Sequence, residues 1–244
     1  MTRGVLGVIP ARLASTRLPR KVLREIAGKP MIWHVYQAAR RAPHLTDVLV
    51  ATDADEVVEA CRHLHIPAVL TSPDHASGTD RVWEVAQGRA ADVYVNIQGD
   101  EPLVTPGHVE KLVEPFRTQP LTAVTTLKIR ATEAEVATPS VVKVVCDVSG
   151  RALYFSRHPI PFDRDGAGAL VYKHFGLYAY RPHALDAFHR LPPSPLEIAE
   201  RLEQLRFLEN GLPITVVETS EPTVGVDTEA DLRTVEALLA KRRS

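Results

Sequence analysis

Residues 5–21, VLGVIPARLASTRLPRK, give the first indication of how this chain folds. The apolar run at residues 5–9 stops at Pro10, which predicts a short buried strand followed by a loop. The loop, residues 10–21, carries four cations and three small residues: Arg12, Arg17, Arg20, Lys21, Ala14, Ser15 and Thr16. Guanidinium groups and a lysine suit phosphate oxygens, and small residues let backbone N–H groups approach an anion. The pattern favours a phosphate site at the end of the strand, with a solvated surface loop as the alternative.

Outward from this strand, apolar runs alternate with helical patterns. We expect further strands at residues 47–51, 68–70 and 93–97, and helices at residues 31–41, 56–64 and 80–87. Strands that alternate with helices predict an α/β fold with a parallel sheet covered on both faces. Ligands of such sheets bind beyond the carboxyl ends of the strands, so the loops after the first and fourth strands are the first candidate sites.

The middle of the chain has a different pattern. Strand-like segments at residues 122–129, 141–145, 153–156 and 175–180 indicate a mixed sheet, with an inserted β-rich lobe around residues 130–180. A helix at residues 196–210 that ends at Gly211, a strand at 214–217 and a helix at 229–239 complete the pattern. We therefore expect residues 1–244 to form one α/β domain with a mixed central sheet.

The composition excludes several classes of protein. The net charge is −1, with 45% hydrophobic and 24% charged residues, which is typical of a globular protein and not of a nucleic-acid or membrane-surface binder. Cys61 and Cys146 lack the spacing of a metal site, and no apolar stretch reaches transmembrane length. We expect a cytoplasmic protein that binds neither nucleic acid nor membrane.

Two acidic motifs are candidates for metal binding. NIQGDEP, residues 96–102, follows the fourth predicted strand, and Mg²⁺ takes one or two protein carboxylates together with water and phosphate oxygens. Asp100 is the preferred ligand and Glu101 the alternative, while an acidic turn that caps the next helix would explain the motif equally well. GVDT, residues 225–228, precedes the last predicted helix. Asp227 either caps that helix or, if Thr228 is the cap, is available for another role.

Three further motifs offer side chains for a substrate. Arg157 lies among aromatic residues in LYFSRHPIPFDRD, residues 153–165, where it could meet a substrate carboxylate. His174 and Tyr178 have equal parity in KHFGLYAY, residues 173–180, so on a strand they share a face, although a lone histidine is more often structural. Glu203 and Gln204 fall in the predicted helix at residues 196–210, where an exposed polar face is the alternative.

The stretch SGTDR, residues 77–81, resembles the start of a helix, with Ser77 or Thr79 as its cap. Gly78 would also permit the close approach of a base or ribose. Structural and ligand-binding roles are equally compatible with this stretch.

These motifs together resemble those of the 3-deoxy-manno-octulosonate (Kdo) cytidylyltransferases, in order and over nearly the whole chain. The matching stretches are IPARLASTRLPRK (9–21), GKPMIWHVY (28–36), DHASGTDR (74–81), NIQGDEP, YFSRHPIPFDRD (154–165), HFGLYAY (174–180), SPLE (194–197), LEQLR (202–206) and GVDT. The opening loop and QGDEP also resemble other sugar nucleotidyltransferases, whereas YFSR, HFGLYAY and LEQLR point to Kdo.

The resemblance implies transfer of CMP from CTP to Kdo, for lipopolysaccharide biosynthesis, by a homodimer. The implied fold is a Rossmann-like nucleotidyltransferase α/β/α sandwich with a mixed central sheet and a smaller β-rich dimerisation lobe. The residues implied to bind the nucleotide are Pro10, Ala11, Arg12, Ser15, Lys21, Ser77, Gly78, Arg81 and Gln98. Asp100 and Asp227 are implied to bind Mg²⁺, and with Arg12 and Lys21 they form the implied catalytic set. The residues implied to bind Kdo are Gln98, Arg157, His174, Tyr178, Glu203 and Gln204.

The chain departs from the family pattern at two places. Arg20 replaces a glycine that is usual between the proline and the lysine, which would add bulk and charge beside the triphosphate, and His158–Pro159 replaces small or polar residues. Three alternatives stay open: a cytidylyltransferase for a sialic acid, one for an 8-amino analogue of Kdo, and a non-catalytic sensor of nucleotide sugars. LEQLR and HFGLYAY favour Kdo over sialic acid, and the retention of both aspartates argues against a sensor.

Overall fold

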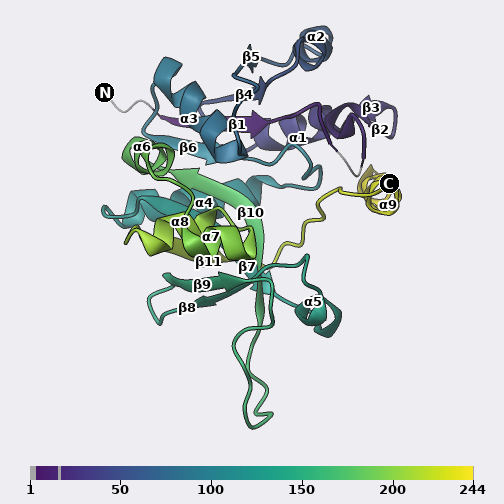
Figure 1. Cartoon of the computed structure of the whole chain (residues 1–244). Coiled ribbons are helices and arrows are strands. Elements are labelled where there is room, and N and C mark those ends of the chain that lie inside the picture. Colours follow the sequence, from purple (N-terminus) through teal and green to yellow (C-terminus); the bar gives the residue numbers. More distant parts are fainter. Residues whose placement is uncertain (1–3, 16–17, 244) are drawn as a thin grey trace. The chain divides into compact units, whose positions relative to one another are not determined.

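The computed structural model describes residues 4–15 and 18–243, so Thr16 and Arg17 of the predicted phosphate loop lie outside the described residues. The chain divides into two compact units. The first unit contains the residues up to Glu110 together with those from Thr223 onward, and the second unit is Lys111–Pro222. Each unit is described separately below (Figure 1).

The first unit contains four parallel strands in the order β6 (Val93–Asn96), β1 (Val5–Pro10), β4 (Asp47–Thr52) and β5 (Ala68–Leu70). Consecutive residues of β1, β4 and β6 are buried, and because neighbouring strand residues point to opposite faces, both faces of this sheet are covered. The connecting helices are α1 (Met31–Arg40), α2 (Asp55–His63) and α3 (Gly78–Gly88). The four predicted strands and three predicted helices are confirmed within two residues at each end.

Short elements complete the N-terminal part of the first unit. The loop after β1 leads into a 3-10 turn, η1 (Lys21–Leu23), and a small hairpin of β2 (Glu25–Ile26) and β3 (Lys29–Pro30). Ser77 caps α3, since its hydroxyl accepts a hydrogen bond from the Asp80 N–H at 3.1 Å. Ser77, and not Thr79, is therefore the cap of the SGTDR stretch.

The C-terminal helix α9 (Glu229–Arg243) belongs to the first unit and lies beside the β2–β3 hairpin (Figure 1). An apolar cluster joins this helix to the N-terminal residues: Leu18, Ile26, Met31, Leu103, Val226, Leu232 and Val235. The Ala27 N–H also donates to the Glu236 carboxylate at 3.1 Å. Burial of this cluster brings the two ends of the sequence together and fixes the segment that leads into α9.

The second unit contains a mixed sheet, as predicted. Strand β7 (Val124–Arg130) pairs in parallel with β11 (Ile214–Glu218) and antiparallel with β10 (Tyr172–Tyr180). Strand β8 (Lys143–Cys146) pairs antiparallel with β10 and with β9 (Ala152–Ser156). These antiparallel strands lie within residues 130–180, where the sequence predicts a β-rich lobe.

The predicted single helix at residues 196–210 is wrong. Two short helices, α7 (Pro195–Glu200) and α8 (Gln204–Glu209), replace it, because Arg201 adopts a left-handed conformation with φ 55°. The Glu209 carboxylate at the end of α8 accepts a hydrogen bond from the Leu196 N–H at 3.1 Å. The second helix thus caps the first, a tertiary contact that a uniform helical pattern does not reveal.

Three helices were not predicted: α4 (Pro106–Thr118), α5 (Glu133–Ala137) and α6 (Pro182–Arg190). Pro115 lies inside α4 and weakens its helical pattern in the sequence. Among the described residues, no helix combines the length and apolar character needed to cross a membrane.

Candidate functional site

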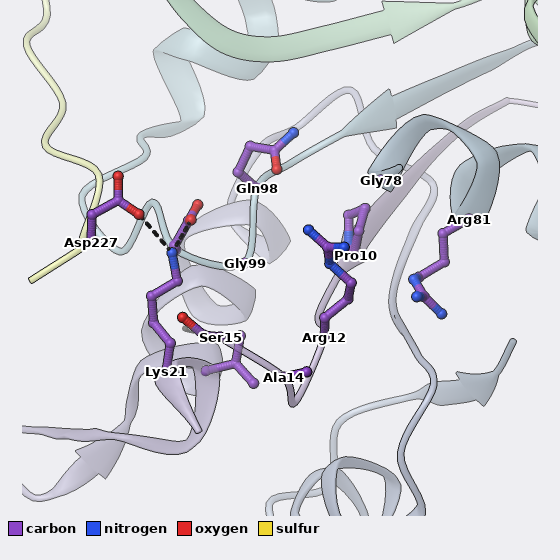
Figure 2. A pocket seen from close by; sticks show the side chains of 12 residues that line it. Pro10, Arg12, Ala14, Ser15, Lys21, Gly78, Arg81, Gln98, Gly99 and Asp227 are labelled. Carbon is purple, nitrogen blue, oxygen red and sulfur yellow. Dashed lines mark hydrogen bonds and ion pairs between the residues drawn. The ribbon is translucent and has the colours of Figure 1, made fainter. Parts of the chain in front are cut away.

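A cavity of about 530 Å³ opens beyond the carboxyl ends of β1 and β6 in the first unit, where an α/β sheet is expected to bind its ligand (Figure 2). Twelve residues line it: Pro10, Arg12, Ala14, Ser15, Lys21, Val22, Gly78, Arg81, Gln98, Gly99, Asp100 and Asp227. Nine of these were predicted from the sequence, and they come from four separate segments of the chain. Ala14, Val22 and Gly99 were not predicted as site residues.

Backbone forms part of the cavity wall where the loop after β6 crosses the end of β1. A Cβ atom on Gly99 would lie 2.7 Å from the carbonyl oxygen of Pro10, closer than any side chain tolerates. On Gly78 a Cβ atom would lie 3.6 Å from the Pro10 ring, which is an ordinary contact. Gly99 is therefore needed for close packing of the two loops, and the glycine between Gln98 and Asp100 was the signal for it in the sequence.

Asp100 and Asp227 converge on the ammonium group of Lys21. Lys21 Nζ donates to Asp100 Oδ2 at 2.6 Å and to Asp227 Oδ1 at 3.0 Å (Figure 2). The Val226 N–H donates to the Asp100 carbonyl at 2.9 Å, which holds the two acidic segments side by side. Three segments from the beginning, middle and end of the chain thus meet at one cation.

Thr228 frees the Asp227 carboxylate from capping α9. Its hydroxyl accepts the Asp231 N–H at 3.2 Å, while the Asp231 carboxylate accepts the Thr228 N–H at 2.8 Å. This reciprocal pair satisfies the start of the helix. The alternative in which Asp227 is the cap is thereby wrong.

The alternative ligand Glu101 does not line the cavity. Its carboxylate accepts a hydrogen bond from the Thr223 hydroxyl at 2.6 Å. This leaves Asp100 as the acidic residue of the NIQGDEP motif that faces the cavity.

The electrostatics favour a charged Lys21. Burial opposes its charged form, but the charges and hydrogen bonds of Asp100 and Asp227 outweigh this and raise the Lys21 pKa above its usual value of 10.5. The Lys21 side chain is 13% exposed, against 31% for Asp100 and 44% for Asp227. The ammonium is thus the enclosed member of the triad, and the carboxylates keep an open side toward the cavity.

Arg12 and Ser15 supply a donor surface on the same cavity. Within the described residues, Arg12 is exposed and pairs with no carboxylate, so its guanidinium is available to an anion. Figure 2 shows Arg12 near Pro10 and Gly78, whereas Lys21 lies on the Asp227 side. The cavity therefore has a cationic wall at Arg12 and an acidic corner at Asp100 and Asp227.

Arg81 has a fixed position at the cavity wall. Its guanidinium is fully buried, pairs with Asp53 at 2.9 Å, and donates to the Thr71 hydroxyl and to the Ser72 carbonyl. Arg81 Nε is buried without a hydrogen-bond partner. Because Asp53 compensates its charge, Arg81 is suited to offering a fixed donor and not to neutralising phosphate.

Some predicted residues lie outside the cavity wall. Ala11 is fully buried and its N–H donates to the Ala51 carbonyl at 2.9 Å, while Ser77 serves as the cap of α3. Arg20 was expected to crowd the triphosphate, but its side chain pairs with Glu56 on α2 and does not line the cavity. The Arg20 backbone has a φ of 55°, which is a left-handed conformation that glycine adopts without strain. This conformation explains why glycine is usual at this position in the family that the chain resembles.

In the second unit, His174 and Tyr178 lie together as their equal parity predicts. Their ring centroids are 5.3 Å apart, and Phe155 packs on the other side of His174 at 5.0 Å. Desolvation in this aromatic setting lowers the pKa of His174 to about 3. His174 is therefore neutral at physiological pH.

Thr126 defines the tautomer of His174. The Thr126 hydroxyl, which has a single hydrogen to donate, lies 2.8 Å from the Leu177 carbonyl and 3.0 Å from His174 Nε2. The Phe175 carbonyl lies 3.1 Å from the same hydroxyl. With its hydrogen on either carbonyl, the hydroxyl accepts the second bond from His174 Nε2–H. Nδ1 is left as an acceptor, which suits a substrate hydroxyl that donates its hydrogen.

Two other predicted Kdo-binding residues carry unsatisfied buried atoms. Among the described residues, the buried side-chain nitrogen and oxygen atoms without a hydrogen-bond partner are Tyr178 OH, Gln204 Nε2 and Arg81 Nε. Burial, followed by the neighbouring Tyr180 and Glu203, raises the Tyr178 pKa well above its usual value, while the nearby Thr126 hydroxyl acts in the opposite direction. Within the described part of the chain, no contact of Tyr178 OH meets the geometry of a hydrogen bond. Orphaned buried polar atoms are costly, so their restriction to three predicted ligand-binding residues favours a binding role.

Arg157 is held by backbone carbonyls in the second unit. Its guanidinium donates to Glu200 O at 2.7 Å and to Pro139 O and Arg201 O, both at 3.3 Å. Its backbone carbonyl accepts a hydrogen bond from Lys143 Nζ at 2.6 Å. None of the guanidinium bonds goes to a carboxylate, so two of its five N–H groups stay available to an acidic ligand.

Comparison with known proteins adds independent information. The cytidylyltransferase family model matches residues 6–218. The 3-deoxy-manno-octulosonate cytidylyltransferase of Acidobacterium capsulatum is 61% identical over 240 residues, which cover 98% of each protein. The protein of the same name from Koribacter versatilis is 57% identical over 238 residues, with 97% of this chain and 90% of the relative covered.

Solved structures agree with these relatives. A CMP:2-keto-3-deoxy-manno-octonic acid synthetase, solved in complex with CTP, superposes with a TM-score of 0.95 at 46% identity and covers 98% of this chain and 99% of its own. A glucose-1-phosphate thymidylyltransferase from Bacillus anthracis has a TM-score of 0.69 at 19% identity, over 96% of this chain and 94% of its own, and shares the fold. The predicted nucleotidyltransferase α/β fold is confirmed.

Proposed function

The chain belongs to the cytidylyltransferase family, among the 3-deoxy-manno-octulosonate cytidylyltransferases, and on that premise we propose that it transfers CMP from CTP to Kdo, releasing pyrophosphate. The observation that carries this proposal is the cavity beyond β1 and β6, in which a cationic loop faces the Asp100–Asp227 pair. Nucleotidyl transfer needs positioned substrates and compensated charge more than covalent help from the protein.

The cavity supplies the contacts that a nucleoside triphosphate requires. Arg12 and Ser15 are suited to the phosphate oxygens, and Lys21 adds a charge that stabilises the departing pyrophosphate. Gly78 and the fixed Nε of Arg81 lie on the wall that we assign to the cytidine. Because the guanidinium of Arg81 is held by Asp53, its unpaired donor would point in one direction and favour one pattern of acceptors on a base.

The acidic corner fits Mg²⁺. Two carboxylates converge on a single cation there, and no group of three or more metal-ligating side chains occurs among the described residues. Mg²⁺ typically takes one or two carboxylates and completes its shell with water and phosphate oxygens, so Asp100 and Asp227 suffice. When bound, Mg²⁺ would neutralise negative charge at the reacting phosphate and lower the pKa of a coordinated hydroxyl.

Residues of the second unit are proposed to bind the sugar acid. Arg157 offers its remaining donors to the Kdo carboxylate, and His174 Nδ1 accepts a hydrogen bond from a sugar hydroxyl. Tyr178 OH and Gln204 Nε2, which have no hydrogen-bond partner among the described residues, would gain one from a polar ligand. Glu203 completes the proposed set of this unit. Gln98, which the resemblance also implies for Kdo, belongs to the first unit and lines its cavity.

Three broader features remain part of the proposal. We expect one nucleotidyltransferase domain over residues 1–244 with a dimerisation lobe around residues 130–180, a homodimer, and a cytoplasmic location. Size-exclusion chromatography with light scattering measures the oligomeric state directly. A monomer at all concentrations would contradict the dimer.

The reaction is tested by pyrophosphate release. Purified protein with CTP and Mg²⁺ is offered Kdo, 8-amino-Kdo and N-acetylneuraminate in parallel, with the Asp100→Asn variant as the inactive control. Release with Kdo is expected. Release with N-acetylneuraminate alone would overturn the substrate assignment, and no release with any sugar would overturn the enzymatic function in favour of a sensor.

A further inference from the structure

Lys21 occupies the point on which the two acidic residues of the site converge. Its ammonium lies 2.6 Å from one carboxylate and 3.0 Å from the other (Figure 2). A divalent ion held by both carboxylates needs the same oxygen atoms. The Lys21 ammonium and such an ion therefore compete for one position.

The charges explain why this pairing forms. Without a cation, Asp100 and Asp227 would repel each other, because the Val226 N–H to Asp100 carbonyl bond holds their segments together. The Lys21 ammonium offsets part of the negative charge of the two carboxylates. A divalent ion that arrives with a triphosphate is attracted by these carboxylates, and its phosphates are attracted by the ammonium.

Phosphate oxygens bound in the cavity would offer the Lys21 ammonium an alternative partner. Lys21 lines the cavity together with Arg12 and Ser15, so phosphate oxygens bound there would compete with the carboxylates for its ammonium. Once the ammonium bonds to phosphate, Asp100 Oδ2 and Asp227 Oδ1 lose their bond to Lys21, and a divalent ion no longer competes with the ammonium for these two atoms.

We infer that Lys21 is an internal counter-ion that keeps divalent metal off the Asp100–Asp227 pair until a triphosphate withdraws its ammonium. This inference rests on the proposed function, since it takes a metal-bound triphosphate as the ligand. It predicts that metal binds weakly in the absence of nucleotide and that metal and nucleotide strengthen each other's binding.

Binding of Mn²⁺ alone tests the inference. Free Mn²⁺ is measured by electron paramagnetic resonance during titration of the nucleotide-free wild type, Lys21→Met and Lys29→Met. Lys29 is exposed and bonds to neither carboxylate, so Lys29→Met removes the same charge nearby without freeing the pair. Lys21→Met is expected to bind Mn²⁺ at least tenfold more tightly than either. Adding Asp227→Asn to Lys21→Met should abolish that gain.

Equal or weaker Mn²⁺ binding by Lys21→Met, at a thermal midpoint close to that of the wild type, would overturn the inference. If Lys21→Met fails to fold, Lys21→Gln provides the same comparison with a polar side chain. The result is separable from that of the proposed function. Pyrophosphate release with Kdo but no gain in Mn²⁺ affinity would refute the counter-ion role alone, whereas a gain without release with any sugar would refute the transferase reaction alone.

Discussion

Replacement of Gly99 by alanine tests how the cavity is built. A Cβ atom there would lie 2.7 Å from the Pro10 carbonyl oxygen, whereas carbon and oxygen atoms ordinarily approach to about 3.3–3.6 Å. Val22 and Ala11 already stand at 3.5 Å and 3.7 Å, so the new methyl group cannot retreat without disturbing them. The two loops must separate by roughly 0.6–0.9 Å.

This displacement has consequences for both stability and binding. Overpacking of this kind costs about 1–3 kcal/mol of unfolding free energy. Pro10 and Gly99 both line the cavity, so the same movement shifts the donors that we assign to the phosphates. A hydrogen bond to a charged group contributes about 1.5–3 kcal/mol, so the loss of one such bond lowers affinity on the order of 10- to 100-fold. We expect CTP affinity to fall about 10- to 100-fold.

Urea denaturation and calorimetric titration with CTP measure the two effects. Gly88→Ala is the matched control, because Gly88 ends α3 and a Cβ there meets nothing within 4 Å. That variant should keep its CTP affinity and gain up to about 1 kcal/mol, since alanine is the better helix former. A Gly99→Ala protein with wild-type stability and wild-type CTP affinity would refute this account of the loop crossing.

Three other substitutions are informative. Asp227→Asn should lower kcat at least 100-fold in the pyrophosphate assay. It should change the unfolding free energy by less than about 1 kcal/mol, because the Lys21–Asp227 pair is partly exposed. A kcat near that of the wild type would exclude Asp227 as a metal ligand. Tyr178→Phe should keep or raise the thermal midpoint, since it removes an unsatisfied buried hydroxyl, and should raise the KM for Kdo; a large loss of stability would show that the hydroxyl is bonded. The His174 pKa is lowered from 6.5 to about 3, so the unfolded state binds the proton at a higher pH than the folded state. The free energy of unfolding of the wild type should therefore fall by on the order of a few kcal/mol as the pH decreases from 6.5 toward 3. His174→Gln should weaken this pH dependence, whereas His183→Gln, at an exposed position, should not. The free energy of unfolding is measured by urea denaturation at each pH. The same pH dependence in both variants would contradict a neutral His174.

Sequence patterns located the strands of the first unit because the signals involved are local. An apolar run such as residues 5–9 carries its own burial preference, and loops that follow parallel strands lie at one edge of the sheet. That rule predicts a site at the loops after the first and fourth strands, which carry Pro10 and Asp100, and both residues line the cavity. Sequence patterns do not predict α4, because Pro115 interrupts its helical pattern. They predict one helix in place of α7 and α8, because the left-handed conformation of Arg201 leaves no signal in the sequence.

The sequence by itself determined the α/β fold of this protein, the family it resembles and the residue types of the candidate site. Only the tertiary structure decided which of those residues meet. Lys21 and Asp227 are 206 positions apart, and they are joined because α9 buries its apolar side chains against Leu18, Ile26 and Met31. The tertiary structure also pairs Arg20 with Glu56 at the surface and buries Arg81 against Asp53. The spacing of residues predicts local strands and loops. Which charged side chains from distant segments meet depends on how the hydrophobic core brings those segments together.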